Sequence, residues 1–184
     1  MINIQNIWEG VKKGNRDAQK ALYDYSCDDL TNVCKRYLSD ASFLDAVQET
    51  YIKIFTKSKA YDSSKGSLSA WMARIAVNEC LHILRKQKKI VFFDVLDYEV
   101  EDKQEEEFIA DITAEEIYNE VEKLPIGYRT VFNLFVVEGY THKEIGEILK
   151  LSPSSSRSQL ARAKSLLVKN FKKKTNLRSY EATR

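Results

Sequence analysis

The chain contains little glycine or proline and has no long apolar run. Among its 184 residues there are six Gly and two Pro. Because both residues weaken helix interiors, their scarcity favours a mostly helical fold. No stretch reaches the roughly 18 consecutive apolar residues of a membrane span, and the N-terminus lacks the basic-then-apolar order of a signal peptide. We therefore expect no membrane insertion and a cytoplasmic location.

Residues that carry catalysis or bind metals are also scarce, with three Cys and two His. Cys27, Cys34 and Cys80 are odd in number and lack CxxC spacing, which indicates a reduced compartment and buried packing residues. No glycine-rich phosphate loop follows a strand pattern, and no acidic cluster has the spacing of metal ligands. We expect no enzyme, no metal site and no cofactor.

The charges are strongly segregated along the chain. Residues 1–91 carry 15 cations and 10 anions, and residues 92–122 carry one cation and 13 anions. Residues 150–178 carry nine cations and no anion. This pattern predicts two modules that contact polyanions, separated by a solvated acidic linker. The alternative for the linker is an acidic helix packed on a partner.

Helical periodicity predicts a first module of four helices. Two apolar sets near the start predict two consecutive helices: Ala18, Ala21, Leu22 and Tyr25, then Leu30, Val33, Cys34 and Tyr37. A third helix is expected over about 43–57, and its apolar stripe consists of Leu44, Val47, Tyr51, Ile54 and Phe55. A polar stretch separates it from a fourth helix over about 68–86.

A second module of helices begins near Thr113, which stands in capping-box spacing with Glu116. That helix ends before Pro125, a second runs over about 127–137, and a third follows the N-cap Thr141 as far as Leu149. The predicted fold class is all-α, with two small helical modules joined by an acidic linker and a helix-turn-helix, winged-helix-like second module. The expected divisions are residues 1–91, a linker at 92–112, residues 113–174 and a basic tail at 175–184.

The stretch EGYTHKEIGEILKLSPSSSRSQLARAK, residues 138–164, contains two helical segments around a three-residue gap. Ser152 as N-cap and Pro153 at the first helical position predict a helix-turn-helix over 141–162. One side of its second helix is apolar, with Leu160, Ala163, Leu167 and Phe171. The other side is polar, with Ser154, Ser158, Arg162, Ser165 and Lys169. An acid-free polar face favours a DNA duplex as ligand, and a helical hairpin with a solvated face is the alternative.

Two positions of this motif are unusual. Lys150 occupies the turn position where glycine usually adopts a left-handed conformation, at a cost of about 1 kcal/mol. Ser156 falls on the apolar side of its helix, and we expect its hydroxyl to bond to a carbonyl of its own helix.

Two further surfaces are candidates for binding. Trp71, Arg74, Asn78, His82 and Arg85 share one face of the fourth helix, where an aromatic ring, an amide and guanidinium groups could hold an unpaired base. The alternative places Trp71 at the edge of the core and the rest in solvent. On the third helix, Asp45, Gln48, Glu49 and Ile52 share a face that could meet a partner protein or simply be solvated.

Together these segments resemble the sigma-70 family of bacterial transcription initiation factors, specifically its short extracytoplasmic-function group. The resemblance runs from about Trp8 to Phe171. WEGVKKGNRDAQKALYDYS is similar to the family's opening helix, DAVQETYIKIF to its polymerase-binding helix, and KGSLSAWMARIAVNECLHILRK to its minus-ten helix. EKLPIGYRTVFNLFVVEGYTHKEIGEILKLS, followed by SPSSSRSQLARAKSLL, is similar to its minus-thirty-five module, sigma region 4.

The resemblance implies a role for each surface. The polymerase-binding residues, which would dock on a coiled coil of the largest polymerase subunit, are Asp45, Gln48 and Glu49. The minus-ten candidates are Trp71, Arg74, Asn78 and Arg85. The minus-thirty-five candidates are Ser154, Ser155, Arg157, Ser158 and Arg162. The chain departs from the usual family pattern at Gly146, Lys150, Pro153, Ser154 and Ser156.

We therefore expect a factor that binds core RNA polymerase and promoter DNA and stabilises strand opening. The resemblance also implies an anti-sigma protein that masks these surfaces. One alternative is a self-sufficient regulator that dimerises on palindromic DNA. Another is a nucleic-acid hydrolase, which would need a carboxylate or histidine cluster that the sequence does not supply.

Overall fold

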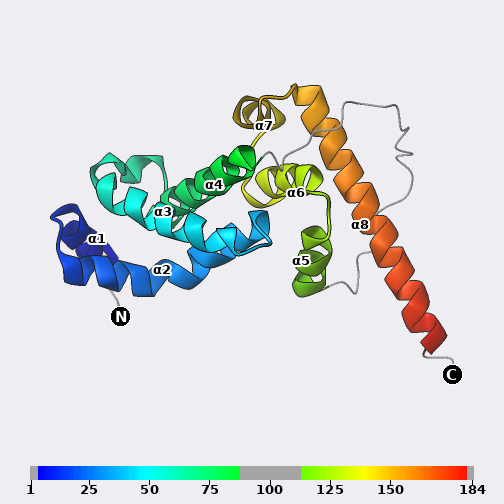
Figure 1. Cartoon of the computed structure of the whole chain (residues 1–184), viewed down its shortest axis with the longest axis horizontal. Coiled ribbons are helices and arrows are strands. Elements are labelled where there is room, and N and C mark those ends of the chain that lie inside the picture. Colours follow the sequence, from blue (N-terminus) through cyan, green and yellow to red (C-terminus); the bar gives the residue numbers. More distant parts are fainter. Residues whose placement is uncertain (1–3, 88–112, 182–184) are drawn as a thin grey trace. The chain divides into compact units, whose positions relative to one another are not determined.

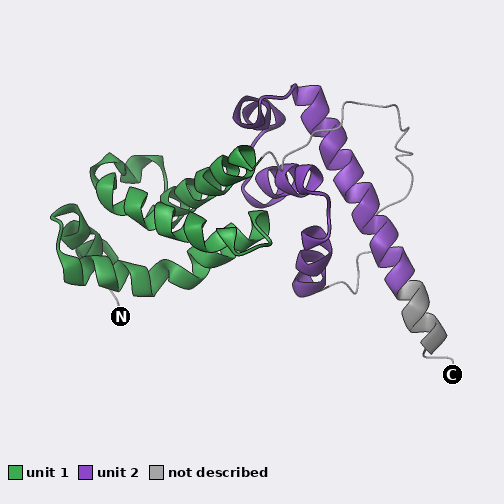
Figure 2. Cartoon of the chain, in the orientation of Figure 1, with its two compact units in different colours: residues 1–89 green, residues 90–184 purple. Residues whose placement is uncertain are grey.

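The structure, a computed structural model, describes residues 4–87 and 113–181, with side chains described as far as residue 174. The chain separates into two compact units, residues 1–89 and 90–184 (Figure 2). The described parts of both units consist of helices and connecting turns, without a strand. This confirms the predicted all-α fold. The predicted linker at 92–112 lies outside the described residues.

Unit 1 is a small helical bundle (Figure 1). Its elements are α1 (Ile4–Lys12), α2 (Arg16–Tyr37), α3 (Ser42–Thr56), the short 3-10 turns η1 (Ser58–Ala60) and η2 (Ser63–Lys65), and α4 (Leu68–Lys86). Helices α2, α3 and α4 pack against one another, and α1 packs on α2. The core at their centre includes Leu22, Tyr37, Ile54, Met72 and Leu81, each almost fully buried.

The two consecutive helices predicted near the start are one continuous helix, α2. The prediction was wrong because Ser26, a polar residue, occupies a core position between the two apolar sets. Its hydroxyl donates to the Leu22 carbonyl at 2.7 Å and lies 2.8 Å from the Tyr51 hydroxyl on α3. The buried face therefore continues through Leu22, Ser26 and Leu30 without a break.

The predicted apolar stripe of α3 is wrong at one end. Val47, Tyr51 and Ile54 are buried, but the Leu44 side chain is 60% exposed. Phe55 is half-buried. The expectation that all three cysteines pack in the core is confirmed for Cys34 and Cys80, whereas Cys27 is only half-buried.

Unit 2 is built around one long helix. Its elements are α5 (Ala114–Glu122), α6 (Ile126–Phe132), the π-helical turn η3 (Asn133–Val137), α7 (His142–Leu149) and α8 (Pro153–Glu181). Helices α5, α6 and α7 all contact α8. Val131, Leu134, Ile145 and Ala163 form the centre of this second core.

The helix predicted over 127–137 changes type partway. After Phe132 the backbone widens into a π-helical turn, in which the Glu138 amide donates to the Asn133 carbonyl at 3.0 Å. Val136 and Val137 at the end of this turn are half exposed. An apolar period indicates a helix but does not distinguish its type, so the change could not be predicted from the pattern.

Candidate nucleic-acid and polymerase interface

Each of the two helices in the helix-turn-helix of unit 2 starts with local hydrogen bonds that the sequence predicts. The Glu144 amide donates to the Thr141 hydroxyl, and the Thr141 amide donates to the Glu144 carboxylate at 2.8 Å, which completes a capping box on α7. At the start of α8 the Ser155 amide donates to the Ser152 hydroxyl at 3.0 Å. Both predicted N-caps are therefore confirmed, and they fix where each helix of the motif starts.

The turn between α7 and α8 passes through Lys150 in the left-handed conformation, with φ 57° and ψ 47°. It is the only non-glycine residue with positive φ in the described chain. The Gly146 carbonyl accepts hydrogen bonds from the amides of Lys150 and Leu151, and these bonds close the end of α7. Lys150 thus adopts a conformation that a side chain disfavours.

Replacing Lys150 by glycine is expected to raise the free energy of unfolding of unit 2 by about 1 kcal/mol, because glycine adopts this conformation without a Cβ clash. Lys143 is the matched control, since it is also exposed but lies in helical backbone. There the same change should lower the free energy of unfolding by about 1 kcal/mol. Denaturation followed by circular dichroism measures both. Equal destabilisation by the two substitutions would contradict the strain at Lys150.

Gly146 lies where α7 meets the turn. A Cβ built on Gly146 would be 2.6 Å from the Leu151 carbonyl oxygen and 3.6 Å from the Pro153 nitrogen. No real Cβ lies so close to a backbone oxygen. Gly146, one of the departures from the family pattern, therefore lets the turn through Lys150 approach the axis of α7 closely.

The predicted division of α8 into two sides is confirmed. Leu160, Ala163 and Leu167 are buried against the rest of unit 2, and Phe171 is half-buried. Ser154 and Arg157 are exposed, whereas Ser155, Ser158 and Arg162 are half-buried. The first turn of α8 therefore presents serine hydroxyls and one guanidinium group to solvent, and no acidic side chain.

Ser156 differs from its expectation. Its side chain is fully buried, but its hydroxyl lies 2.9 Å from the His142 Nδ1 atom of α7 instead of bonding to a carbonyl of α8. The His142 ring stacks on Phe135 with centroids 4.4 Å apart. Burial, and then the nearby Arg157 guanidinium, lower the pKa of His142 below its ordinary value. The ring is therefore neutral at pH 7 and joins α7 to α8 by a hydrogen bond between uncharged groups.

The α4 surface of unit 1 combines a partly buried ring with exposed polar groups. Trp71 is half-buried in an aromatic cluster, with its ring centroid 5.6 Å from Trp8 and 5.7 Å from Tyr61. Arg74, Asn78, His82 and Arg85 are exposed along the same helix face. The Arg85 Nε donates to the Leu81 carbonyl at 3.1 Å. Trp71 therefore lies at the edge of the core, and part of its ring remains accessible.

The α3 surface, which we call the docking patch, consists of Leu44, Asp45, Gln48, Glu49 and Ile52, all exposed. Leu44 and Ile52 are 60% and 46% exposed, so apolar side chains flank the polar ones. Leu44 was predicted to belong to the apolar core stripe, but its spacing of four from Gln48 places it on the exposed face. An acidic and apolar patch of this kind suits a partner protein with basic and apolar groups.

A groove of about 610 Å³ lies between α3 and α4. Asp45 and Glu49 line its α3 side, and His82 and Lys86 line its α4 side. Within it the Lys53 Nζ atom is 2.6 Å from the Glu79 carboxylate, whose side chain is only 8% exposed. This ion pair, which no local pattern in the sequence indicates, fixes the docking patch relative to the α4 surface.

The described residues, 4–87 and 113–181, contain neither a helix that could cross a membrane nor a cluster of possible metal ligands. None of their helices is both long enough and apolar enough to cross a membrane. Nor do these residues include a group of three or more His, Cys, Asp or Glu side chains that could hold a metal ion.

Comparison with known proteins agrees with this geometry. Residues 22–90 match the family model of sigma-70 region 2, and residues 114–167 match that of sigma-70 region 4. The chain is 28% identical to the ECF RNA polymerase sigma factor SigW of Bacillus subtilis, over 88% of this chain and 93% of that protein. It is 25% identical to the ECF RNA polymerase sigma-E factor of Haemophilus influenzae, over 90% of this chain and 94% of that protein.

A solved structure shows the same fold at low sequence identity. It is the sigma factor RpoE of Bartonella quintana in complex with the anti-sigma factor NepR, with a TM-score of 0.50 and 18% identity over 83% of this chain and 96% of that one. The two family models together match more than half of the chain, one in each unit. This chain therefore belongs to the sigma-70 family of transcription initiation factors, in its extracytoplasmic-function (ECF) group.

Proposed function

We propose that this sigma factor directs core RNA polymerase to promoters through three surfaces. The docking patch on α3 binds a coiled coil of the largest polymerase subunit. The exposed face of α4 holds the melted minus-ten strand, and the N-terminal turns of α8 contact the minus-thirty-five duplex. The protein acts in the cytoplasm, where the polymerase works, and contributes binding energy while the polymerase carries out the chemistry.

The capped helix-turn-helix carries this proposal. The N-terminal part of α8 is exposed, with Ser154 and Arg157 in solvent. The preceding turn has hydrogen bonds at the end of α7 and at the start of α8. A helix in this position can enter the major groove with its first turns facing the base edges. The absence of acidic residues from 150 to 178 removes repulsion from the phosphates on either side.

The α4 surface supports the minus-ten assignment in a specific way. The contacts of Trp71 with Trp8 and Tyr61 hold its indole ring in one orientation, so little conformational entropy is lost when a base stacks on the accessible part. Arg74 and Asn78 follow along the same face and are exposed. They can pair with the phosphates and base edges of an unpaired strand.

Run-off transcription with core polymerase tests the function. We expect specific transcripts from a promoter only when this protein is added. The polymerase is required because its own active site forms the product. A protein that binds palindromic duplex DNA tightly as a dimer, and gives no transcript with core polymerase, would be the self-sufficient regulator instead.

Replacing Gln48 and Glu49 by alanine together is expected to weaken binding to core polymerase about tenfold or more, because two central polar contacts of the docking patch are lost. Asp28 and Asn32 on α2 form the matched control, since they also carry one carboxylate and one amide at exposed helical positions. Alanine at both of those positions should leave the affinity unchanged. Fluorescence anisotropy with labelled core enzyme measures both, with circular dichroism to check folding. Equal affinity of the two double variants would remove the docking assignment.

We also propose that an anti-sigma protein masks these surfaces in the resting cell. The Bartonella quintana protein of the same fold is held in such a complex. The docking patch on this chain exposes Leu44 and Ile52, apolar side chains that a masking partner would cover. The same residues would then be required for polymerase binding and for inhibition.

A further inference from the structure

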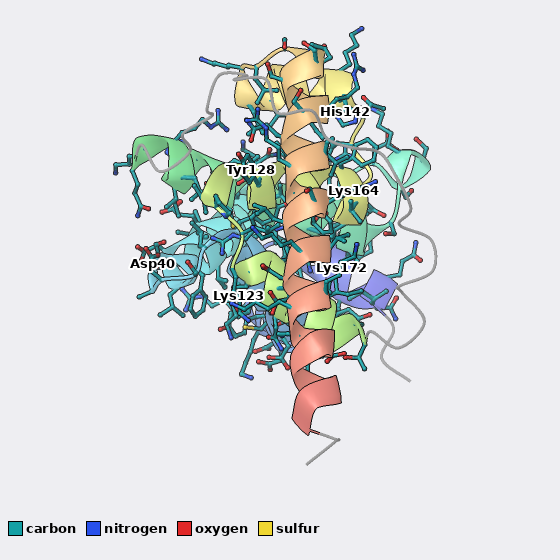
Figure 3. All side chains as sticks on the ribbon, turned by 90° about the vertical axis from the view of Figure 1, so that its right-hand side faces the viewer. Asp40, Lys123, Tyr128, His142, Lys164 and Lys172 are labelled. Atoms are coloured by element: carbon teal, nitrogen blue, oxygen red, sulfur yellow. The ribbon has the colours of Figure 1, made fainter. Side chains whose placement is uncertain are left out.

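Helix α8 continues well beyond the helix-turn-helix and carries a second group of cations. The helix has 29 residues and is therefore about 44 Å long. In its distal half Lys169, Lys172 and Lys173 are exposed, and we call these three residues the lysine strip. None of them forms a salt bridge with another residue of the described chain. Figure 3 looks onto this helix, with Lys164 and Lys172 labelled along its length.

The lysine strip lies on the same side of α8 as Ser154, Ser158 and Arg162, which we call the recognition surface. At 100 degrees per residue, Ser154, Ser158 and Arg162 fall within about 100 degrees of the lysine strip when viewed along the helix axis. The apolar residues Leu160 and Leu167 fall on the opposite side and are buried. One continuous face of α8 therefore presents Ser154, Ser158 and Arg162 in its first half and the lysine strip further along. The exposed Ser165 lies between them, and Arg157 lies on the flank of this face.

The other side of this distal half is held in place by a buried carboxylate. Glu120 of α5 is 2% exposed, and its Oε1 atom lies 2.6 Å from the Lys174 Nζ atom and 2.7 Å from the Lys123 Nζ atom. The Asn170 side-chain amide donates to Glu120 at 3.1 Å. Burial alone would raise the pKa of Glu120, but the two lysines outweigh it and the net pKa is lowered, so the carboxylate is charged at neutral pH.

These contacts give the distal half of α8 a fixed orientation. The inner cation, Lys174, is neutralised by Glu120, whereas the outer cations of the lysine strip point away from the unit. Glu120 therefore acts as a positioning residue. It anchors the distal half of α8 so that the lysine strip faces the same side as the recognition surface.

The length of α8 determines what the lysine strip can reach. Lys172 lies about 27 Å along the axis from Ser154, whereas the major groove is about 12 Å wide. A straight helix whose first turns lie in the groove must leave it within that length and cross the sugar-phosphate backbone. We infer that the lysine strip binds phosphates of duplex DNA outside the minus-thirty-five bases, as a second, sequence-independent contact. This inference rests on the proposed function.

An anionic membrane is the other polyanion that a basic helix could meet. Helices that lie on membranes insert an apolar side beside their cations. In α8 that side is occupied, because Leu160, Ala163 and Leu167 are buried in unit 2. The continuity of the lysine strip with the recognition surface therefore favours DNA.

The test uses the full chain assembled with core polymerase and a promoter duplex. In the double variant Lys172→Gln/Lys173→Gln, we expect the slope of log affinity against log salt to fall by about 2, since about one unit is lost per phosphate contact. The base preference across the minus-thirty-five element should not change. Lys174→Gln is the matched control because it removes the same charge from the same helical turn but on the side facing Glu120. We expect its effect on the slope to be less than half as large per charge.

A second measurement locates the contact on the DNA. Phosphates flanking the minus-thirty-five element are replaced one at a time by uncharged methylphosphonates, and binding of the parent and the double variant is compared. Neutralising the contacted phosphates should weaken the parent but not the double variant. Glu120→Gln should reduce the contribution of the lysine strip while leaving the three lysines in place.

Three outcomes would overturn the inference. The salt slope could be the same in the parent and the double variant, or the double variant could lose affinity for core polymerase instead of DNA. Alternatively, vesicles containing anionic lipid could bind the parent but not the double variant while the DNA slope is unchanged, which would assign the lysine strip to a membrane. In each case run-off transcription by the parent protein would still stand, so failure of the inference is distinguishable from failure of the proposed function.

Discussion

Replacing Arg157 by alanine is expected to cost roughly 1 to 3 kcal/mol of binding free energy on the preferred promoter and to relax the preference at one base position. Arg157 lies one turn into α8 and is exposed. A guanidinium group there can donate two hydrogen bonds to one guanine edge, so the loss should be large for the preferred base and small for the others.

Lys169 provides the comparison for Arg157. It lies more than three turns further along α8, where the lysine strip begins, and should contact phosphate at most. Lys169→Ala is expected to weaken all sequences alike and to lower the salt slope by about 1. Binding of both variants to a library randomised across the minus-thirty-five element, at two salt concentrations, measures these differences. If Arg157→Ala weakened every sequence equally, Arg157 would be a phosphate contact and the recognition surface would lie elsewhere on α8.

Replacing Gly146 by valine is expected to lower the free energy of unfolding of unit 2 by about 3 kcal/mol, the upper part of the range for overpacking. Even a Cβ on Gly146 would lie 2.6 Å from the Leu151 carbonyl oxygen. This oxygen belongs to the backbone of the turn, so relief requires the turn to shift and α8 to move relative to α7. Binding to the minus-thirty-five element should fall together with stability.

Glu147→Val is the matched control, since Glu147 is the next residue of α7 and is exposed. It introduces the same β-branched side chain into the same helix, at a cost of about 0.5 kcal/mol. The difference between the two variants therefore isolates the close approach at Gly146. Amide hydrogen exchange of Ile145 and Leu149, both buried in α7, measures the stability of this motif. Equal protection in the two variants would show that the turn can shift without a loss of stability, which would contradict the prediction.

The starts of the helices could be predicted from the sequence because their causes are local. Each N-cap, at Thr113, Thr141 and Ser152, bonds to an amide three residues further along the chain. The left-handed turn at Lys150 is predictable for the same reason, since a three-residue gap between two helices of this motif needs one residue with positive φ. The two sides of α8 follow from its period alone.

Features with distant causes could not be predicted in the same way. Ser26 interrupts the apolar pattern of α2, and its acceptance in the core depends on Tyr51, 25 residues away. The partner of Ser156 is His142, on the preceding helix, and the buried Glu120 is held by residues 50 and more positions away on α8. In each case a polar residue is buried because the fold brings a partner to it. A local sequence pattern does not indicate that partner.

The roles of the candidate surfaces follow less directly from the sequence than the fold does. The docking patch, the α4 stripe and the start of α8 could each be found as exposed faces from helical spacing. The residues themselves favour duplex DNA at the start of α8 and an unpaired base on α4. The polymerase and the two promoter elements came from the resemblance to the sigma-70 family. The variants described above test the roles of Gln48 and Arg157.

The aromatic cluster of Trp8, Tyr61 and Trp71 has an optical consequence. The chain has two tryptophans, and both belong to this cluster in unit 1. Light that excites indole but not phenol therefore reports on unit 1 alone, and unit 2 contributes no signal. Because Trp71 lies at the surface proposed for the melted strand, indole emission provides an intrinsic, label-free probe of that surface in the isolated protein.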